Sequence, residues 1–235
     1  MKRILITNDD GIRSSGIIRL VEAARALGEV TVIAPDREHS AKAHSISILE
    51  PVDFMPYAFP VPGVTAWVCS GTPSDCVRVG LAYLLPQKPD LVLSGINCGF
   101  NIASDIQYSA TVGAALEAAH QGIPAAAFSE PYNPDHSVTD RFLPDVLELL
   151  EELLPGRDEI LNINFPLASC NGILTGRTVS SGSMFRGSYQ LTEHLPGGGL
   201  RLSAEWVPDD ACDDGSDFRA VLDHYISIGV VRNIG

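Results

Sequence analysis

Two adjacent carboxylates follow the first apolar segment of the chain. Ile4–Thr7 is an apolar run, and the turn-like sequence Asn8–Gly11, with Asp9 and Asp10 at its centre, comes directly after it. Two like charges at the end of a buried strand repel each other and are costly to desolvate, so we expect a cation between them. Oxygen ligands suit Mg²⁺, Mn²⁺ or Ca²⁺ better than zinc or copper. The alternative for an isolated Asp-Asp-Gly is a solvated turn in which one aspartate caps the following helix.

Other polar residues follow later apolar segments of the chain. Ser40 lies in the loop after the second predicted strand, and Asn97 and Asn101 lie in the loop after a strand near residue 93. The carboxyl ends of parallel strands form the ligand crevice of open α/β sheets, so these residues are expected to converge with the two aspartates. Ser109–Thr111 adds a helix N-terminus, whose free backbone N–H groups can bind phosphate. Taken alone, Asn97 is also typical of a turn and Thr111 of an ordinary N-cap.

These residues need a layered scaffold, and the hydrophobic pattern predicts one. Strands and helices alternate, and the short connection between the first two strands predicts a parallel βαβ unit. We therefore expect an α/β fold: a three-layer, Rossmann-like, mostly parallel sheet. The predicted strands are 4–7, 30–34, 90–95, 125–128 and 161–165, and the predicted helices are 15–27, 71–85, 111–120 and 138–154.

The remaining segments do not follow this alternation. Residues 45–70 combine short apolar pieces with prolines and predict an irregular or antiparallel excursion. After Pro166 the runs shorten, and three glycines at 197–199 favour a C-terminal β-hairpin or extended arm. We expect one domain over 1–235, with a core at 1–166 and a hairpin or arm region at 167–235. Residues 170–228 are too sparsely apolar for a second core, so they are expected to pack on a neighbouring copy.

Composition excludes several classes of function. The 235 residues carry a net charge of −13, which argues against binding a nucleic-acid polymer. No apolar run approaches the roughly 18 residues that span a bilayer, and no signal-peptide pattern is present, so no membrane partner is expected. The five cysteines form no Cys-x-x-Cys pair and are expected to fill the core of a reduced, cytoplasmic protein.

Six short motifs occur in order along the chain. They are Asn8-Asp9-Asp10-Gly11, Ala34-Pro35-Asp36-Arg37 with Ser40, His44-Ser45-Ile46, Gly71-Thr72-Pro73-Ser74-Asp75-Cys76, Ser94-Gly95-Ile96-Asn97 with Gly99 and Asn101, and Tyr108-Ser109-Ala110-Thr111. Each is weak alone, but the ordered set, from residue 3 to about 228, resembles the SurE family of survival-protein nucleotidases. Two positions depart from the family pattern. Ala110 stands where the family usually has glycine, and Gly229-Val230-Val231 stands where it usually has Thr-Pro-Leu.

The resemblance implies metal-dependent hydrolysis of nucleoside 5′- and 3′-monophosphates, with polyphosphate as a further substrate. It implies that one divalent cation, Mg²⁺ or Mn²⁺, is held by Asp9, Asp10, Ser40 and Asn97, and that Asp9 and Asp10 are catalytic. It also implies a phosphate pocket lined by Asn97, Asn101, Ser109, Ala110 and Thr111. For the C-terminal arm it implies exchange between copies, and therefore a homodimer or homotetramer.

The main alternative is a phosphoacceptor receiver domain, a signalling module that also carries an acidic pair after its first strand. Asp53 resembles its phosphoacceptor and Lys88 its lysine, but neither lies in the expected strand context. A dinucleotide-binding oxidoreductase is disfavoured because the first turn lacks Gly-x-Gly-x-x-Gly. The histidines form no metal pair at helical spacing. His39 and His44 flank Ser40, and we expect surface or structural roles for both.

Overall fold

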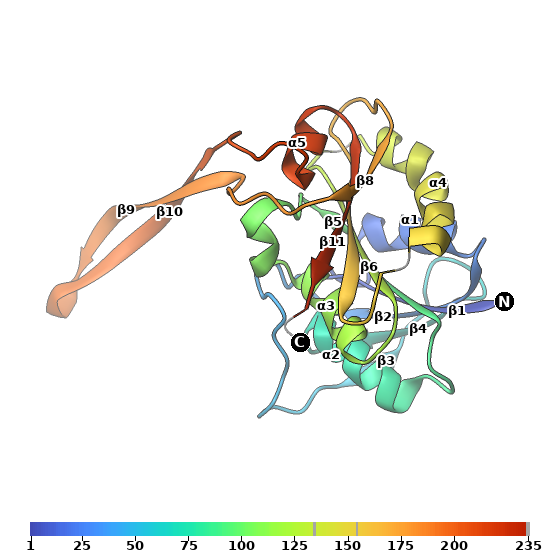
Figure 1. The fold of residues 1–235 in the computed structure, drawn as a ribbon. Helices are drawn as coiled ribbons and strands as arrows, with labels where there is room; N and C mark the ends of the chain where they lie inside the picture. The colour runs from blue at the N-terminus through green and yellow to red at the C-terminus, as the bar shows by residue number, and fades with distance from the viewer. Residues whose placement is uncertain (134, 154, 234–235) are drawn as a thin grey trace.

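One large mixed sheet forms the centre of the molecule in the computed structural model, which describes residues 1–133, 135–153 and 155–233. Its strands lie in the order β3-β4-β2-β1-β5-β6-β7-β11-β8 (Figure 1). The strands, including β9 and β10 of a separate hairpin, are β1 Lys2–Thr7, β2 Gly28–Pro35, β3 Phe54–Pro56, β4 Thr65–Cys69, β5 Leu91–Cys98, β6 Ala125–Glu130, β7 Glu159–Asn164, β8 Ile173–Arg177, β9 Phe185–Leu195, β10 Gly199–Pro208 and β11 Ile226–Arg232. The strands from β4 to β7 in this order, namely β4, β2, β1, β5, β6 and β7, run parallel, which confirms the predicted fold class.

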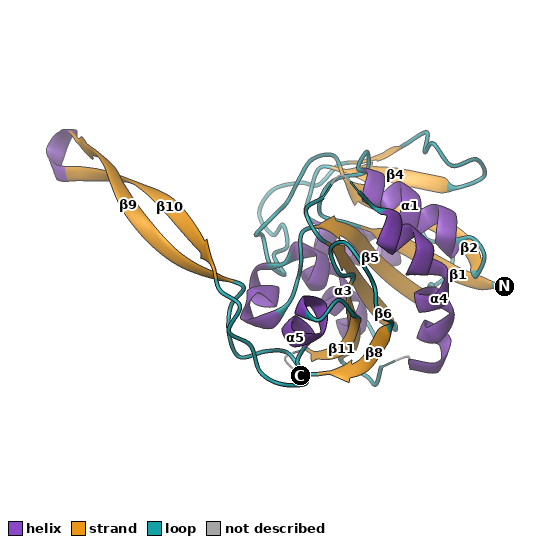
Figure 2. Cartoon of the chain, turned by 90° about the horizontal axis from the view of Figure 1, so that it is seen from above, coloured by secondary structure: helices purple, strands orange, loops and turns teal. Residues whose placement is uncertain are grey.

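Helices cover both faces of this sheet and make three layers. Helices α1 and α4 pack together on one face, whereas α2 and α3 pack together on the other (Figures 1 and 2). Short α5 packs against β11 near the end of the chain. The helices are α1 Ser15–Ala24, α2 Pro73–Val79, α3 Ala110–His120, α4 Ser137–Leu153 and α5 Asp217–Leu222, and the short helical turns are η1 Gly80–Leu84, η2 Ala103–Tyr108 and η3 Pro196–Gly198.

The alternation of side chains along β1 explains why the two layers form. Ile4 and Ile6 are buried in the cluster that contains α1 and α4, and Leu5 is buried in the cluster on the opposite face. Successive strand residues point to opposite faces, so a continuous apolar run is buried on both sides. The alanines Ala114, Ala115 and Ala118 of α3 let this helix pack closely on the sheet. Among the described residues, no helix is both long and apolar enough to cross a membrane.

Some element boundaries differ from the sequence prediction. Strand β5 extends to Cys98, so Asn97 lies in the strand and not in the loop after it. The helix predicted over 71–85 is shorter, because α2 ends at Val79 and a π-helical turn follows it. Residues 45–70 hold two short strands, of which β3 pairs antiparallel with β4, and β4 extends the parallel sheet beside β2. The predicted helix end at residue 154 lies outside the described residues.

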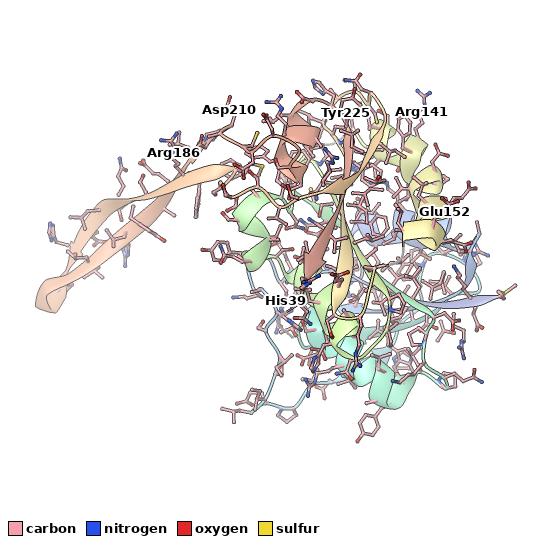
Figure 3. All side chains as sticks on the ribbon, in the orientation of Figure 1. His39, Arg141, Glu152, Arg186, Asp210 and Tyr225 are labelled. Atoms are coloured by element: carbon pink, nitrogen blue, oxygen red, sulfur yellow. The ribbon has the colours of Figure 1, made fainter. Side chains whose placement is uncertain are left out.

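The C-terminal third divides between the core and a projecting hairpin. Residues 170–228 were expected to pack on a neighbouring copy, but β8, α5 and β11 pack on the sheet of their own chain. Strand β11 pairs antiparallel with β7 and parallel with β8, and its apolar residues Ile226 and Ile228 are fully buried. These pieces are short, but they complete an existing core and need not form a second one. Of the described residues in this third, those of the β9–β10 hairpin project from the body, and Figure 3 shows its residue Arg186 away from His39 in the body.

Candidate functional site

The candidate site lies at the topological switch point of the sheet, between β1 and β5, where the strand order changes direction. From β1 the chain continues to β2 on one side, and β5 pairs with β1 on the other side before the chain moves on to β6. Loops leave the carboxyl ends of β1 and β5 in opposite directions, which opens a crevice at this switch point. Asp9 and Asp10 follow β1, and Asn97 lies at the end of β5. The topology therefore brings these three residues to one place.

The turn after β1 is held by its own side chains. The Asn8 amide donates to the carbonyl of Gly11 (3.0 Å) and to the hydroxyl of Ser14 (2.8 Å) at the start of α1. Gly11 has a φ of +94°, a conformation that glycine adopts without steric cost. The backbone N–H of His39 donates to the carbonyl of Asp9 (2.7 Å), which ties the loop after β2 to this turn. Both aspartates are therefore presented on a fixed backbone.

A small pocket of about 150 Å³ brings most of the predicted site residues together. Five predicted residues line it: Asp9, Ser40, Asn97, Asn101 and Ser109. The remaining lining residues are Ala41, Cys98, Asp105 and Tyr108. The lining does not include three predicted residues, Asp10, Ala110 and Thr111. Asp10 and Ala110 each follow a lining residue in the sequence, and Thr111 is hydrogen-bonded to Asp9. None of the described lining residues is a lysine or an arginine.

Asp9 is the most unusual charged group of the site. Its side chain is buried, and its Oδ1 accepts a hydrogen bond from the Thr111 hydroxyl. Burial raises the pKa of Asp9 to about 6; the Thr111 hydrogen bond opposes this shift and the charge of Asp10 adds to it. No cationic side chain among the described residues forms an ion pair with this carboxylate. A buried carboxylate without a cation is unfavourable, so Asp9 is a functional candidate on physical grounds.

Asp10, Ser40 and Asn97 add further oxygen atoms. Half-buried Asp10 accepts from the backbone N–H of Cys98 (3.1 Å), and burial raises its pKa while this hydrogen bond lowers it. The Asn97 amide nitrogen donates to the carbonyl of Gly99 (2.8 Å), which leaves its oxygen as an acceptor. The Ser40 hydroxyl donates to Glu38 (2.6 Å) and keeps its lone pairs. All three groups can offer oxygen to a cation.

Asn101 is fixed from several sides. Its amide nitrogen donates to the Ser129 hydroxyl (2.8 Å), and its backbone N–H donates to the Asn164 side chain (2.9 Å). Its carbonyl accepts from the amides of Asn162 (2.7 Å) and Asn164 (3.0 Å). The ends of β6 and β7 therefore hold this pocket residue in place.

Ser109 and Thr111, at the start of α3, have different hydrogen-bond partners. Ser109 is the N-cap, and its hydroxyl accepts from the N–H of Val112 (3.1 Å). Thr111 lies inside the helix and donates to Asp9, so the alternative that Thr111 is an ordinary N-cap is wrong. Ala110 is buried at the first helical position. Because the first turn of a helix leaves N–H groups without intrahelical acceptors, this end can receive an anion.

The donor set fits a hard divalent cation. Asp9 and Asp10 supply carboxylates, and Ser40 and Asn97 supply neutral oxygens, which is the chemistry that Mg²⁺ and Mn²⁺ accept. No group of three or more His, Cys, Asp or Glu residues that could hold a metal occurs in the described ranges. Binding of a metal at this site therefore needs the neutral oxygens of Ser40 and Asn97 in addition to the two carboxylates. All four residues offer oxygen atoms, whereas zinc prefers the nitrogen of histidine and the sulfur of cysteine.

Sequence reasoning missed several residues near the site. Glu38 raises the pKa of Asp9 and Asp10 by its charge, and it lies in the same loop as Ser40. Asp105 and Tyr108 line the pocket between Asn101 and Ser109, a spacing that could have indicated them. The prediction that all cysteines fill the core is wrong for Cys98, which is exposed in the pocket lining.

The two histidines lie outside the pocket lining. His44 contacts Glu117 of α3, with its Nε2 2.9 Å from the carboxylate. His39 is buried, and burial lowers its pKa. The surface or structural roles expected for both stay predictions. The receiver alternative is not supported, because exposed Asp53 precedes the edge strand β3, three strands away from β1.

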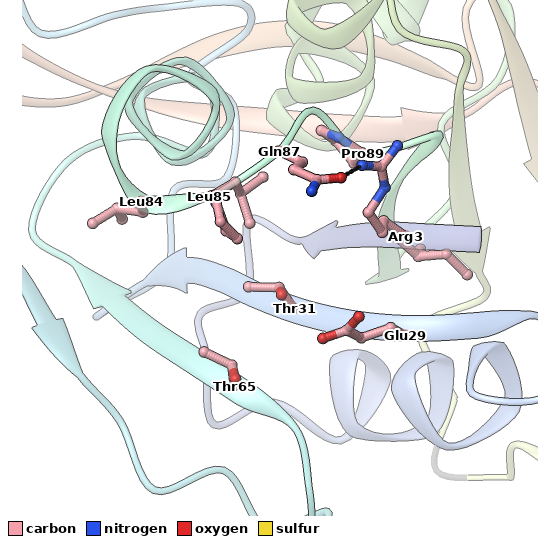
Figure 4. A pocket seen from close by; sticks show the side chains of 10 residues that line it. Arg3, Glu29, Thr31, Thr65, Leu84, Leu85, Gln87 and Pro89 are labelled. Atoms are coloured by element: carbon pink, nitrogen blue, oxygen red, sulfur yellow. Dashed lines mark hydrogen bonds between the residues drawn. The ribbon is translucent and has the colours of Figure 1, made fainter. Parts of the chain in front are cut away.

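A larger pocket of about 410 Å³ lies at the opposite edge of the sheet (Figure 4). Its lining includes Arg3 and Glu29 from the starts of β1 and β2, and Leu84, Leu85 and Gln87 before β5. Arg3 is held there by Gln87 and by Asp90, with 2.9 Å between Nη2 and Oδ1 of the aspartate. None of the predicted site residues lies in this pocket.

Comparisons with known proteins agree with the geometry of the site. The family described as "Survival protein SurE" matches residues 4–184. The chain is 39% identical to a 5′-nucleotidase SurE of Synechococcus sp. (strain JA-3-3Ab), over 96% of this chain and 89% of the relative. It is 42% identical to a 5′-nucleotidase SurE of Gemmatimonas aurantiaca, over 96% and 90%. The crystal structure of the SurE protein from Aquifex aeolicus superposes with a TM-score of 0.81 at 33% identity, covering 98% of this chain and 93% of that one. This chain belongs to the SurE family.

Proposed function

We propose that this chain is a metal-dependent phosphomonoesterase that hydrolyses nucleoside 5′-monophosphates to nucleoside and phosphate. Relatives named 5′-nucleotidase SurE match it over almost its whole length. The observation that carries the proposal is the buried Asp9 carboxylate, which lines a pocket without a basic side chain among its described residues. A phosphate dianion would be repelled there by Asp9, Asp10 and Glu38. A bound cation removes that repulsion.

The metal is held by Asp9, Asp10, Ser40 and Asn97 in this proposal, and Mg²⁺ or Mn²⁺ fits their oxygen atoms best. When bound, such an ion acts as a Lewis acid on the phosphoryl group and lowers the pKa of a water molecule. Thr111 donates to Asp9 and fixes the rotamer of this ligand. The N–H of Cys98 orients Asp10 in the same way. One aspartate can also accept a proton from the attacking water.

The phosphate group is proposed to lie against Asn97, Asn101, Ser109, Ala110 and Thr111. The first turn of α3 directs N–H groups toward this place, and the helix dipole favours an anion. Asn101 is preoriented by Ser129 and Asn164, so its position does not depend on the substrate. Such preorganised donors stabilise charge that develops in the transition state.

The proposal extends to nucleoside 3′-monophosphates and polyphosphate as further substrates. The pocket shares Asp105 and Tyr108 with a second pocket of about 390 Å³ beside η2 and the hairpin base, which leaves room for different groups attached to the phosphate. A panel of metals against nucleoside 5′- and 3′-monophosphates and polyphosphate, with phosphate release as the measurement, tests this proposal. We expect activity with Mg²⁺ or Mn²⁺ and none in EDTA. Undiminished activity in EDTA would overturn the metal-dependent mechanism.

We further propose that the chain forms a homodimer or homotetramer through the β9–β10 hairpin. Several large apolar side chains of this hairpin are exposed: Tyr189, Leu191, Leu200 and Leu202. Exposed apolar patches of this kind favour association. Light scattering at micromolar concentration should give at least twice the monomer mass, and a monomer would contradict the proposal. All five cysteines are free, which supports a reduced, cytoplasmic location.

A further inference from the structure

A second pocket adjoins the candidate site. It encloses about 390 Å³ and is lined by Phe100, Asp105, Tyr108, Met184, Phe185 and Trp206. Asp105 and Tyr108 belong to the linings of both pockets, so the two are continuous. The small pocket presents mainly polar groups and carboxylates, whereas this second pocket presents four aromatic rings and a methionine. With the proposed cation bound in the small pocket, the two halves therefore suit a ligand with a phosphate end and a flat apolar end.

The second pocket is built by contacts between segments that are distant in the sequence. The Asp105 carboxylate in η2 accepts from the hydroxyl of Ser183 (2.7 Å) and from the backbone N–H of Met184 (2.8 Å). The N–H of Ser104 donates to the carbonyl of Gly182 (2.9 Å). These bonds fix the base of the hairpin against η2. The aromatic wall is therefore held at a set place relative to the small pocket.

Trp206 is placed by the residue opposite it in the hairpin. It pairs with Gly187 of β9, and a Cβ atom at that position would lie 2.8 Å from the indole ring. The absence of a side chain lets the ring lie over the neighbouring strand. Trp206 is 63% exposed and Tyr108 is 60% exposed, so both rings keep open surface. Flat, exposed rings at the rim of a polar pocket provide surfaces on which a planar ligand can stack.

We propose that this second pocket binds the nucleobase of a nucleoside monophosphate whose phosphate lies in the adjoining pocket. This inference rests on the proposed function and names the part of the substrate that the hairpin base recognises. Every nucleobase has a π-face, so stacking on Trp206, Tyr108 or Phe100 tolerates different bases. Asp105 is occupied by Ser183 and Met184, and no other charged side chain lines this pocket in the described chain. We therefore expect weak discrimination among bases.

The test compares AMP with ribose 5-phosphate, which keeps the phosphate and sugar but lacks the base. Trp206→Ala should lower kcat/KM for AMP by roughly 5- to 150-fold, mainly through KM, because stacking on an aromatic side chain contributes this much per base. Hydrolysis of ribose 5-phosphate should not change. Val207→Ala is the matched control, since Val207 is a neighbouring exposed residue of β10 that is not part of the pocket lining.

Three results would overturn the inference. The first is an equal loss for AMP and ribose 5-phosphate, and the second is no loss for either. The third is a change in oligomeric mass in Trp206→Ala that accounts for the loss, which would make the pocket a contact with a second copy. Thermal unfolding and circular dichroism check that the variant folds.

A binding measurement keeps the inference separate from the proposed function. Adenosine should quench the fluorescence of exposed Trp206 in metal-free protein, and ribose should not. Trp67, the other tryptophan, is half-buried in the sheet and should report no change, so Trp206→Ala should abolish the quenching. If the protein hydrolyses neither phosphate ester, the proposed function fails, and quenching by adenosine still decides whether the pocket binds a base.

Discussion

Carboxylates at the two edges of the central sheet, the amino ends and the carboxyl ends of its strands, have pKa values shifted in opposite directions. At the amino edge, exposed Asp90 is hydrogen-bonded to Arg3, which lowers the pKa of Asp90 to about 2. At the carboxyl edge, burial raises the pKa of Asp9 to about 6, and its side-chain partner is the hydroxyl of Thr111. The amino-edge pocket is the larger of the two, but its Arg3 is already paired with Asp90. Pocket size is therefore a poorer guide to the site than an unpaired buried charge.

Burial by itself does not leave a carboxylate unpaired. Glu130, at the end of β6, is as buried as Asp9, but its Oε1 lies 2.6 Å from the guanidinium of Arg19. Asp217 is also buried, and it accepts backbone N–H bonds from Ala103 (3.0 Å), Ser180 (3.0 Å) and Phe218 (2.7 Å). Both carboxylates are satisfied within the chain and hold segments together. Within the part of the chain that the structure describes, Asp9 has neither a guanidinium partner nor three backbone N–H donors, so its charge is the one that a bound cation would compensate.

The largest expected effect comes from neutralising the unpaired carboxylates. Asp9→Asn and Asp10→Asn should each lower phosphate release by roughly 10²- to 10⁴-fold, about 3 to 5 kcal/mol of transition-state stabilisation, because each removes a charged metal ligand. Steady-state kinetics with Mg²⁺ or Mn²⁺ measure this loss. Asp90→Asn, at the amino edge, is the matched control and should keep full activity. Full activity of Asp9→Asn in metal-free buffer would contradict the site.

The second effect concerns the stability of the metal-free protein. The pKa of Asp9 is about 6 in the folded state against an ordinary value of 3.8, so folding favours its protonated form. The stability that protonated Asp9 contributes to the folded state is fully present below pH 3.8 and is lost as the pH rises through 6. In EDTA at pH 7, Asp9→Asn should therefore be more stable than the unsubstituted chain by about 3 kcal/mol.

Denaturant unfolding in EDTA at several pH values measures this difference. The two proteins should converge toward pH 4, because the aspartate is then protonated in both the folded and the unfolded state. A difference that stays constant from pH 4 to pH 7 would show that another property of the substitution causes it. Adding Mg²⁺ should reverse the order at pH 7, since a cation stabilises only the charged site.

The third effect comes from the hydroxyl that supports Asp9. Thr111→Val should lower kcat/KM by about 10-fold, or ~1.5 kcal/mol, because a hydrogen bond to a charged group is lost. Metal affinity should weaken in parallel, since that bond opposes the rise in the pKa of Asp9. Thr111→Ser should restore both. Unchanged metal affinity with reduced turnover would show that Thr111 acts through its phosphate contact alone and not through Asp9.

Ser109→Ala sharpens the same comparison. Ser109 caps α3, so its loss should cost about 1 kcal/mol of stability. A lower thermal midpoint measures that cost. If Ser109 also contacts phosphate, KM should rise as well, with metal affinity unchanged. A variant with unaltered stability would show that the cap contributes little.

The smallest effect is expected at the amino edge. Asp90→Asn removes an exposed ion pair with Arg3, and exposed pairs contribute little to stability. The thermal midpoint should move by no more than the experimental error at 0.15 M salt. A large loss of stability, or any loss of turnover, would show that the two edges are coupled through β1.

The sequence determined the scaffold and the composition of the site. Apolar runs of strand length alternated with helical periodicity, which was sufficient to predict the parallel βαβ units and the confirmed fold class. The two adjacent aspartates were noticeable because such a pair has an energetic cost that needs compensation. Ser40, Asn97 and Asn101 were predicted for the same place because parallel strands end at one edge of a sheet.

The tertiary structure decided what the sequence left open, since those features depend on contacts between distant residues. The hydrogen bond from Thr111 to Asp9 joins positions 102 residues apart, and no local pattern indicates it. Strand β11 pairs between β7 and β8 although its segment looked too sparse for a core. The bonds from Ser183 and Met184 to Asp105 bring the hairpin base to the pocket. Local patterns report which face of an element is apolar, whereas the partner that covers that face is chosen only when the whole chain packs.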